Sequence, residues 1–153
     1  MRRGNSFSPD HTKLDKGMYV TRVNGDDIIT YDIRIKPPNA GDYLSTGGMH
    51  TMEHLFSTYM YNSEWRNHVV YIGPMASRTG FVLIVRSLAP EHAIRLVREA
   101  MHFIRDYNGP IPGATEQECG NYRDQDLPVA RAAANMMTGV LQGWTAEMLR
   151  YSD

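Results

Sequence analysis

Cysteine is nearly missing from this sequence, since its 153 residues contain a single one. One cysteine cannot form an internal disulfide, so the chain is not a disulfide scaffold and we expect it to work in a reducing cytoplasm. The chain also lacks an apolar run long enough for a bilayer-spanning helix. Its basic start, Met1-Arg2-Arg3, is not followed by the apolar core of a signal peptide. The sequence therefore predicts a cytoplasmic protein that does not bind a membrane.

An excess of charge of either sign is also missing, because 16 Lys and Arg residues nearly balance 17 Asp and Glu residues. Without a cluster of basic residues, the sequence gives no reason to expect a nucleic-acid partner. There is no long acidic tract of the kind found in disordered tails. A chain of 153 residues is long enough to bury a hydrophobic core, so we expect a single domain over 1–153.

The most informative stretch is 49–56, where two histidines and a glutamate stand in the order His-x-x-Glu-His. On a helix, His50, Glu53 and His54 share one face. Two imidazoles at this spacing can bind one metal ion, and the carboxylate beside them can move protons. The reverse order, His-Glu-x-x-His, is common in zinc enzymes, and the order found here, His-x-x-Glu-His, also occurs in metallohydrolases. Because the pattern is short, a surface helix with two solvated histidines is the alternative.

Two histidines leave a metal site short of ligands, because tetrahedral zinc takes a third protein ligand and, in a catalytic site, keeps one open position. Cys119 is the candidate, since it lies in the polar segment Glu118-Cys119-Gly120-Asn121. A buried, inert thiol is the alternative for a lone cysteine. A His/His/Cys set would also suit Fe(II) or Co(II).

The pattern of apolar residues predicts four strands and three main helices. Strands are expected over 18–23, 28–36, 69–72 and 80–86. One helix is expected to contain the His-x-x-Glu-His motif, with Ser45 or Thr46 as its cap, and two more are expected over 90–107 and 128–149. Asn24-Gly25 predicts a hairpin turn, and 107–125 is predicted to be a loop. This order favours an α+β fold with a mostly antiparallel four-stranded sheet covered on one face by helices.

The second of these strands has the clearest alternation. Apolar residues such as Ile33 alternate with polar ones such as Asp32 and Arg34, which predicts one buried face and one polar face. On such a face Arg34 could simply pair with Asp32.

Several blocks of the sequence occur together in one known family. They are Ser6-Phe7 with Asp10-His11-Thr12-Lys13, Tyr31-Asp32-Ile33-Arg34, His50-Thr51-Met52-Glu53-His54-Leu55-Phe56, Gly73-Pro74-Met75 with Arg78-Thr79-Gly80-Phe81, Ile111-Pro112-Gly113-Ala114, and Cys119-Gly120-Asn121-Tyr122-Arg123-Asp124. With these blocks the chain resembles the S-ribosylhomocysteine lyase family, LuxS, over nearly its whole length. Blocks in this order are far more specific than the helix motif alone.

The resemblance implies a lyase that converts S-ribosylhomocysteine to homocysteine and 4,5-dihydroxy-2,3-pentanedione, the precursor of autoinducer-2 used in quorum sensing. In this family His50, His54 and Cys119 would bind Fe(II), which zinc or cobalt can replace, and Glu53 would be a general acid/base. Moving the sugar carbonyl requires protons to be taken from neighbouring carbons by a base held close by. The metal, as a Lewis acid, stabilises the negative charge that develops.

The resemblance also implies a homodimer with two active sites at the subunit interface. Ser6, His11 and Arg34 would hold the ribose from the partner subunit.

The chain departs from the family at Ala76-Ser77, where the family has Gly-Cys, and at Val82, where it often has tyrosine. That cysteine is the second acid/base of the family, so Ser77 takes its catalytic position. A serine hydroxyl is much less acidic than a thiol and needs an adjacent base. Two alternatives therefore stay open: a weak or inactive homologue that binds a ribosyl thioether or related sugar, and a small metallohydrolase in which Glu53 activates water.

Overall fold

The four strands of the protein form one antiparallel sheet. The structure, a computed structural model, describes residues 1–4 and 8–151. The strands β1 (Gly17–Asn24), β2 (Ile28–Arg34), β3 (Val69–Pro74) and β4 (Gly80–Arg86) are arranged in the order β1-β2-β4-β3. Each neighbouring pair is antiparallel. Gly25 lies in the turn between β1 and β2 with a φ of 59°, which confirms the predicted hairpin.

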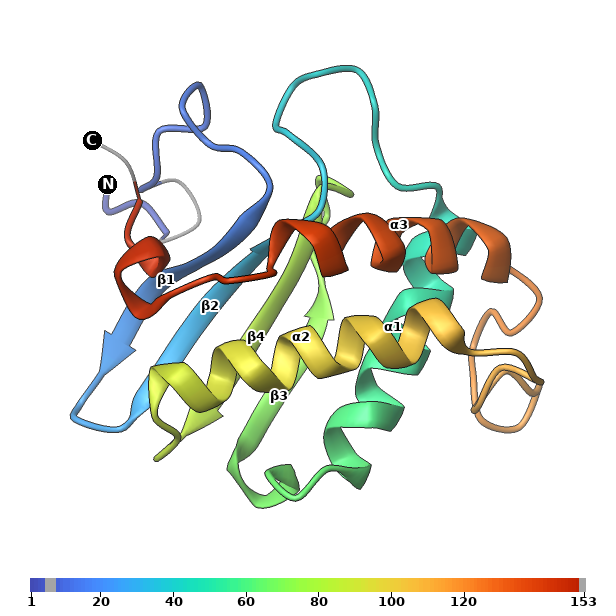
Figure 1. Ribbon diagram of the computed structural model, residues 1–153. Helices are drawn as coiled ribbons and strands as arrows, with labels where there is room; N and C mark the ends of the chain where they lie inside the picture. Colours follow the sequence, from blue (N-terminus) through green and yellow to red (C-terminus); the bar gives the residue numbers. More distant parts are fainter. Residues whose placement is uncertain (5–7, 152–153) are drawn as a thin grey trace.

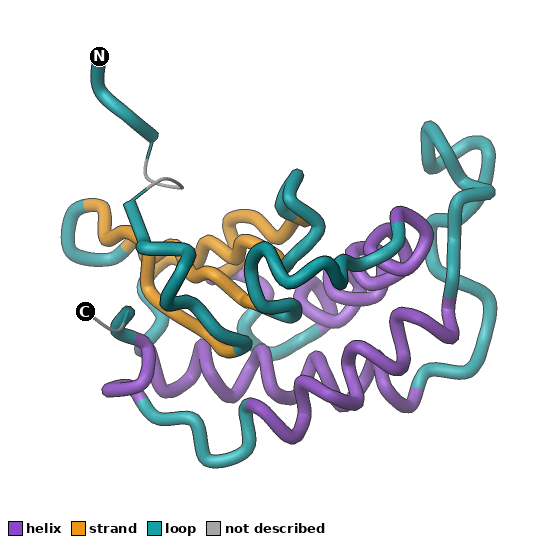
Figure 2. Tube along the Cα trace, turned by 90° about the horizontal axis from the view of Figure 1, so that it is seen from above, coloured by secondary structure: helices purple, strands orange, loops and turns teal. Residues whose placement is uncertain are grey.

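Three helices cover one face of this sheet, as Figures 1 and 2 show. They are α1 (Thr46–Asn62), α2 (Pro90–Asp106) and α3 (Leu127–Val140), and two short 3-10 segments, η2 (Arg66–His68) and η3 (Ala146–Leu149), lie between or after them. This arrangement confirms the predicted α+β class with helices on one face. The segment 107–125 contains no helix or strand, as predicted.

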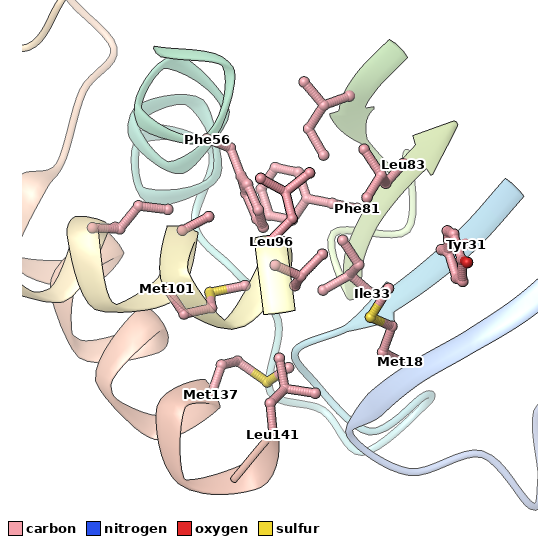
Figure 3. Packing of buried hydrophobic residues seen from close by; sticks show 14 of the residues in the cluster. Met18, Tyr31, Ile33, Phe56, Phe81, Leu83, Leu96, Met101, Met137 and Leu141 are labelled. Carbon is pink, nitrogen blue, oxygen red and sulfur yellow. The ribbon is translucent and has the colours of Figure 1, made fainter. Parts of the chain in front are cut away.

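The core lies between the sheet and the helices (Figure 3). Its largest fully buried side chains include Ile33 of β2, Phe56 of α1 and Phe81 of β4. The rings of Phe56 and Phe81 lie 5.4 Å apart between centroids, which is within the range of favourable aromatic pairs. Methionines such as Met101 and Met137 fill the space between α2 and α3. The metal motif of α1 is therefore built on a well-packed helix.

The last helix ends earlier than the sequence predicted. The prediction ran over 128–149, but α3 ends at Val140, and the chain turns before η3. Gly143 has a φ of 72°, a left-handed conformation that a right-handed helix cannot contain. The indole of Trp144 then donates to the Met18 carbonyl at 3.0 Å. This turn brings the C-terminal segment back to β1.

Both faces of the second half of β2, from Tyr31 to Arg34, are buried, which the alternating pattern did not predict. Asp32 is 2% exposed and Arg34 is 4% exposed, although their side chains project away from the helices. Chain segments from the two ends of the protein lie over this face, including His11 and Tyr151. The polar residues of this strand are therefore part of a covered site instead of a solvated surface.

The N-termini of α1 and α3 are joined to one another. Ser45 caps α1 by accepting a hydrogen bond from the Gly48 amide at 3.1 Å, as predicted, and Asp126 caps α3 through the Val129 amide at 3.1 Å. The Asp126 amide donates to the carbonyl of Gly47 at 3.1 Å. A Cβ added at Gly48 would lie 2.3 Å from Val129 Cγ1, so only glycine permits this approach. The contact fixes the chain before α3 against the metal motif.

Candidate functional site

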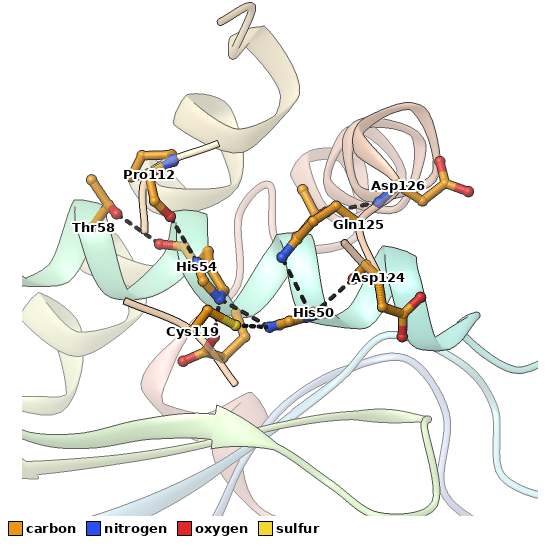
Figure 4. A network of polar contacts seen from close by, with 10 residues as sticks. His50, His54, Thr58, Pro112, Cys119, Asp124, Gln125 and Asp126 are labelled. Atoms are coloured by element: carbon orange, nitrogen blue, oxygen red, sulfur yellow. Dashed lines mark hydrogen bonds and ion pairs between the residues drawn. The ribbon is translucent and has the colours of Figure 1, made fainter. Parts of the chain in front are cut away.

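The structure brings His50, His54 and Cys119 together, and their ligand atoms all lie within 4.8 Å of one another. Figure 4 shows the two imidazoles on α1 pointing toward the thiol of Cys119, which lies in the loop between α2 and α3. The two Nε2 atoms are 3.0 Å apart, and Cys119 Sγ is 3.3 Å from His50 Nε2. The amide of Cys119 donates to the Thr115 carbonyl at 2.9 Å, in a single turn that holds the cysteine in place.

Backbone carbonyls orient both rings. Nδ1 of His50 donates to the Asp124 carbonyl at 2.8 Å, and Nδ1 of His54 donates to the Pro112 carbonyl at 2.7 Å. The loop approaches closely here, since a Cβ on Gly113, whose φ is 73°, would lie 3.2 Å from His54 Nδ1. A histidine that binds a metal typically donates its other ring N–H in this manner.

These contacts determine which ring nitrogens carry protons. A carbonyl can only accept, so each Nδ1 carries the hydrogen and each neutral ring has a lone pair on Nε2. Two lone pairs 3.0 Å apart repel one another unless a cation lies between them. In a tetrahedral site, nitrogen ligands lie about 2.0–2.1 Å and sulfur ligands about 2.3 Å from the metal ion. Two such ligand atoms then lie about 3.3–3.6 Å from one another. The donor set and its spacing therefore fit a divalent metal ion.

Glu53 lies at the edge of this cluster. Its Oε2 is 3.6 Å from Nε2 of His54, and its side chain is about one third exposed, at 32%. The Glu53 carboxylate therefore lies beside the candidate metal-binding atoms, and its role as a general acid/base stays a prediction.

A cavity of about 560 Å³ lies on the other face of the sheet. Its lining includes three residues that the sequence predicted for the site: His11, Arg34 and Ser77. Nδ1 of His11 donates to the Pro9 carbonyl at 2.9 Å, so in the neutral ring Nε2 remains an acceptor. A cavity with this acceptor and the Arg34 cation suits a polyhydroxylated ligand.

The two groups of predicted residues belong to opposite faces of the sheet. Phe81 packs on α1 and pairs in register with Ile33, whereas Val82 pairs with Asp32. Because side chains alternate along a strand, Asp32 and Val82 project away from α1. Among the described residues, none of the His/His/Cys cluster lines the cavity. One chain therefore brings together each half of the predicted site but not the two halves.

Arg34 is held by two partners beneath this cavity. Its Nη2 lies 2.5 Å from Asp32 Oδ2, and its Nη1 donates to Thr79 Oγ1 at 2.6 Å. The alternative that Arg34 pairs with Asp32 is therefore confirmed as a contact, yet the pair still lines the cavity. Asp32 Oδ1 and Arg34 Nε are buried without a hydrogen-bond partner among the described residues, so the pair is only partly satisfied within this part of the chain.

Tyr151 completes this network from the C-terminal segment. Its hydroxyl donates to Asp32 Oδ2 at 3.1 Å, and its ring stacks on Tyr19 with centroids 5.1 Å apart. Burial raises the pKa of Tyr151, and the neighbouring Asp32 charge raises it further. Tyr151 therefore remains a neutral donor throughout the physiological range.

The sequence matches known proteins along almost its whole length. Residues 5–147 match the family model described as S-ribosylhomocysteinase (LuxS). The chain belongs to the LuxS family.

Three curated relatives of this LuxS chain carry the name S-ribosylhomocysteine lyase. The protein of Phocaeicola vulgatus is 40% identical over 152 residues, which cover 95% of this chain and 94% of the relative. That of Borrelia garinii subsp. bavariensis is 38% identical and covers 99% of both chains. That of Clostridium acetobutylicum is 37% identical and covers 97% of both.

Some residues of this LuxS site were not predicted from the sequence. The carbonyls of Pro112 and Asp124 have no sequence signal, because any residue can supply a carbonyl. Gln125 belongs to none of the sequence motifs, yet its Oε1 accepts from Thr51 at 2.7 Å beside His50. Thr79 and Tyr151 were also missed. Ser6, predicted to bind the ribose, lies outside the described residues.

The described helices of this LuxS chain include none with the length and apolar character needed to cross a membrane.

Proposed function

We propose that this protein is a metal-dependent S-ribosylhomocysteine lyase, which releases homocysteine and leaves 4,5-dihydroxy-2,3-pentanedione. The observation that carries the proposal is the His50, His54 and Cys119 cluster with Glu53 beside it, in a chain of the LuxS family. The curated relatives named S-ribosylhomocysteine lyase are matched over nearly their full length, which supports the same activity for this chain.

The reaction consists of proton transfers followed by an elimination. Protons are taken from sugar carbons next to the carbonyl and returned to its neighbours until the carbonyl reaches C3. A proton then leaves C4 and the homocysteine thiolate leaves C5, so the products together contain the atoms of the substrate. Glu53 is the base for one side of the sugar, since its carboxylate is 3.6 Å from His54 Nε2.

We propose Fe(II) as the resident metal, with zinc or cobalt able to replace it. His50, His54 and Cys119 would hold the ion, and thiolate with imidazole suits all three metals. When bound, the ion supplies Lewis acidity toward the sugar oxygens. The Asp124 and Pro112 carbonyls keep both Nε2 atoms free to bind it.

We also propose that the active protein is a homodimer with sites at its interface. One chain carries the metal ligands and Glu53 on one side of the sheet and the cavity with His11 and Arg34 on the other. A symmetric pair can bring the metal half of one chain to the cavity half of its partner. In this arrangement Ser6, His11 and Arg34 hold the ribose from the partner subunit.

The proposed second acid/base position is Ser77, where the family resemblance leads us to expect cysteine. Serine is a weak acid and a weak nucleophile without an adjacent base. This residue favours a second candidate function: a homologue that binds a ribosyl thioether, or a related sugar, with little or no turnover.

Thiol release from S-ribosylhomocysteine by Fe(II)-loaded protein distinguishes the two functions. We expect release of one thiol per substrate, loss of the rate in Glu53→Gln, and an unchanged rate in Glu116→Gln, an exposed glutamate outside the site. A rise in melting temperature with substrate but no thiol would favour the binding function. A large gain in rate for Ser77→Cys would locate the deficit at that position.

We further propose that residues 1–153 form a single domain that acts in the cytoplasm. One hydrophobic cluster joins the sheet to all three helices, which supports a single folding unit. Use of the product as an autoinducer-2 precursor, and a place in thioether recycling, remain proposals drawn from the same family membership.

A further inference from the structure

The hydrogen bonds around Ser77 run in one direction. A guanidinium has five N–H donors and no acceptor, so Arg34 Nη1 donates to Thr79 Oγ1 at 2.6 Å. The Thr79 hydroxyl has one hydrogen, and its other partner is Ser77 Oγ at 2.8 Å. Thr79 Oγ1 has a second lone pair and could also accept from Ser77, but the Thr79 hydrogen would then have no acceptor among the described residues at a position that is 2% exposed. Satisfying this buried hydrogen requires that Thr79 donates to Ser77. Ser77 Oγ accepts in this contact and keeps its own hydrogen for another partner.

The turn that carries these residues is fixed by the backbone. The Arg78 amide donates to the Met75 carbonyl at 3.0 Å, and Arg78 has a φ of 60°. The Thr79 carbonyl accepts from the amides of Ile35 and Lys36 at 2.8 and 3.0 Å. Thr79 is 2% exposed. The direction of the chain of hydrogen bonds is therefore built into a rigid turn between β3 and β4.

The hydrogen of Ser77 faces a cavity. Ser77 is exposed in the single chain and lines the cavity together with His11 and Arg34. Among the described residues, the contact to Thr79 is the one hydrogen bond recorded for the Ser77 hydroxyl. Within residues 1–4 and 8–151, no basic side chain is hydrogen-bonded to Ser77 Oγ to take its hydrogen, which a serine would need in order to act as a base itself.

We propose that Ser77 is a fixed hydrogen-bond donor to a sugar oxygen, and that Thr79 is the positioning residue that directs it. The inference rests on the proposed function of the site and assigns Ser77 a different role from a proton-abstracting thiolate. A donor aimed at an oxygen that gains negative charge stabilises the transition state without taking a proton. The proton transfers are then left to Glu53 and to the substrate itself.

A double-mutant cycle tests the coupling between the two hydroxyls. We expect Ser77→Ala to lower kcat/KM for S-ribosylhomocysteine by about 10- to 100-fold, since a hydrogen bond to an oxygen that carries charge is worth about this much. Thr79→Val should cause a loss of about tenfold alone but less than about twofold in the S77A background, because it acts through Ser77. Thr79→Ser, which keeps the hydroxyl, should restore most of the rate. Equal losses from Thr79→Val in both backgrounds would overturn the proposal.

A second double-mutant cycle combines Ser77→Ala with changes in the ligand and leaves Thr79 intact, in case the Thr79→Val variant does not fold. The affinity of wild type and S77A for S-ribosylhomocysteine is compared with their affinity for its 2-deoxy and 3-deoxy analogues by calorimetry. If Ser77 donates to one of these hydroxyls, Ser77→Ala weakens binding of the parent compound but not of the analogue that lacks it. Equal weakening for all three ligands contradicts the proposal.

The two cycles also separate this inference from the proposed function. If the wild type releases thiol but the effects of the paired changes are additive in both cycles, the donor role of Ser77 is overturned and the lyase function is retained. Wild type that binds without releasing thiol overturns the lyase, and the binding cycle still decides the role of Ser77. Wild type that neither binds nor releases thiol contradicts both.

Discussion

At the residue scale, the hydroxyl of Tyr31 is buried without a hydrogen-bond partner in the part of the chain that the structure describes. Leaving such a group unpaired costs about 1–3 kcal/mol, whereas removing it costs nothing in hydrogen bonding. We therefore expect Tyr31→Phe to leave the free energy of unfolding unchanged or to raise it by about 1 kcal/mol. Urea denaturation at neutral pH measures this. A loss of more than about 1 kcal/mol would show that the hydroxyl has a partner.

The same tyrosine makes stability depend on alkaline pH. Burial raises the pKa of Tyr31 to about 12, with a smaller contribution from the Glu91 charge. In the unfolded chain the pKa is about 10, so the folded protein binds more protons between these values. The stabilisation is complete below about pH 10 and is lost as the pH rises toward 12. Part of this alkaline decline in the free energy of unfolding should be absent in the Tyr31→Phe variant.

Tyr151 gives a second prediction at this scale. Tyr151→Phe keeps the ring stacked on Tyr19 but removes the donor to Asp32. Because Asp32 holds Arg34, we expect weaker binding of S-ribosylhomocysteine, by about five- to tenfold, with a loss of stability of about 1 kcal/mol. Calorimetry and urea denaturation measure the two effects.

The matched control for this variant is Tyr61→Phe, because Tyr61 is exposed on α1. We expect no change in either quantity for the control. Equal affinities of Y151F and wild type would mean that the Asp32 and Arg34 pair is positioned without the phenol.

At the element scale, two glycines in helices give opposite predictions. Gly48→Ala would force a Cβ to within 2.3 Å of Val129 Cγ1, whereas a Cβ at Gly139 meets nothing within 4 Å. We expect Gly48→Ala to lower the free energy of unfolding by about 1–3 kcal/mol through overpacking. Gly139→Ala should raise it by up to about 1 kcal/mol, because alanine favours the helix.

Metal affinity extends the comparison between these two variants. Displacing α3 also moves Asp124, whose carbonyl orients His50, so Gly48→Ala should weaken metal binding by about 10-fold. Gly139→Ala should not change it. Metal competition titrations provide the measurement, and equal affinities in the two variants would show that the contact between α1 and α3 does not support the metal site.

At the scale of the whole molecule, the two halves of the proposed site make complementation a direct test of the dimer. Glu53→Gln disables the metal half, and His11→Ala disables the cavity half. If each site combines halves from two chains, mixed dimers contain one intact site. An equal mixture of the two inactive variants, after subunit exchange, should then show about a quarter of the wild-type rate. A mixture that stays inactive would mean that each site lies within one chain.

The sequence predicted the strands and the shared face of His50, Glu53 and His54, because local patterns encode both. The alternation in 28–36 and the spacing of His50, Glu53 and His54 depend on strand and helix periodicities, which hold wherever the chain folds. The chain ends were harder to predict. The break after Val140 depends on Gly143 and on the indole of Trp144 reaching Met18, a contact between residues far apart in the sequence.

The sequence by itself determined the α+β class, the four strands and the His-x-x-Glu-His face, because each depends on residue type and spacing. It also offered Cys119 as the one thiol, but only folding places that thiol beside His50. The tertiary structure decided the rest. The carbonyls that orient His50 and His54, the burial of Asp32 and Arg34, and the direct contact of Tyr151 with Asp32 depend on segments that only folding brings together. The direction of the Ser77 hydrogen bond likewise follows from Arg34 reaching Thr79 across the sheet, which no spacing in the sequence encodes.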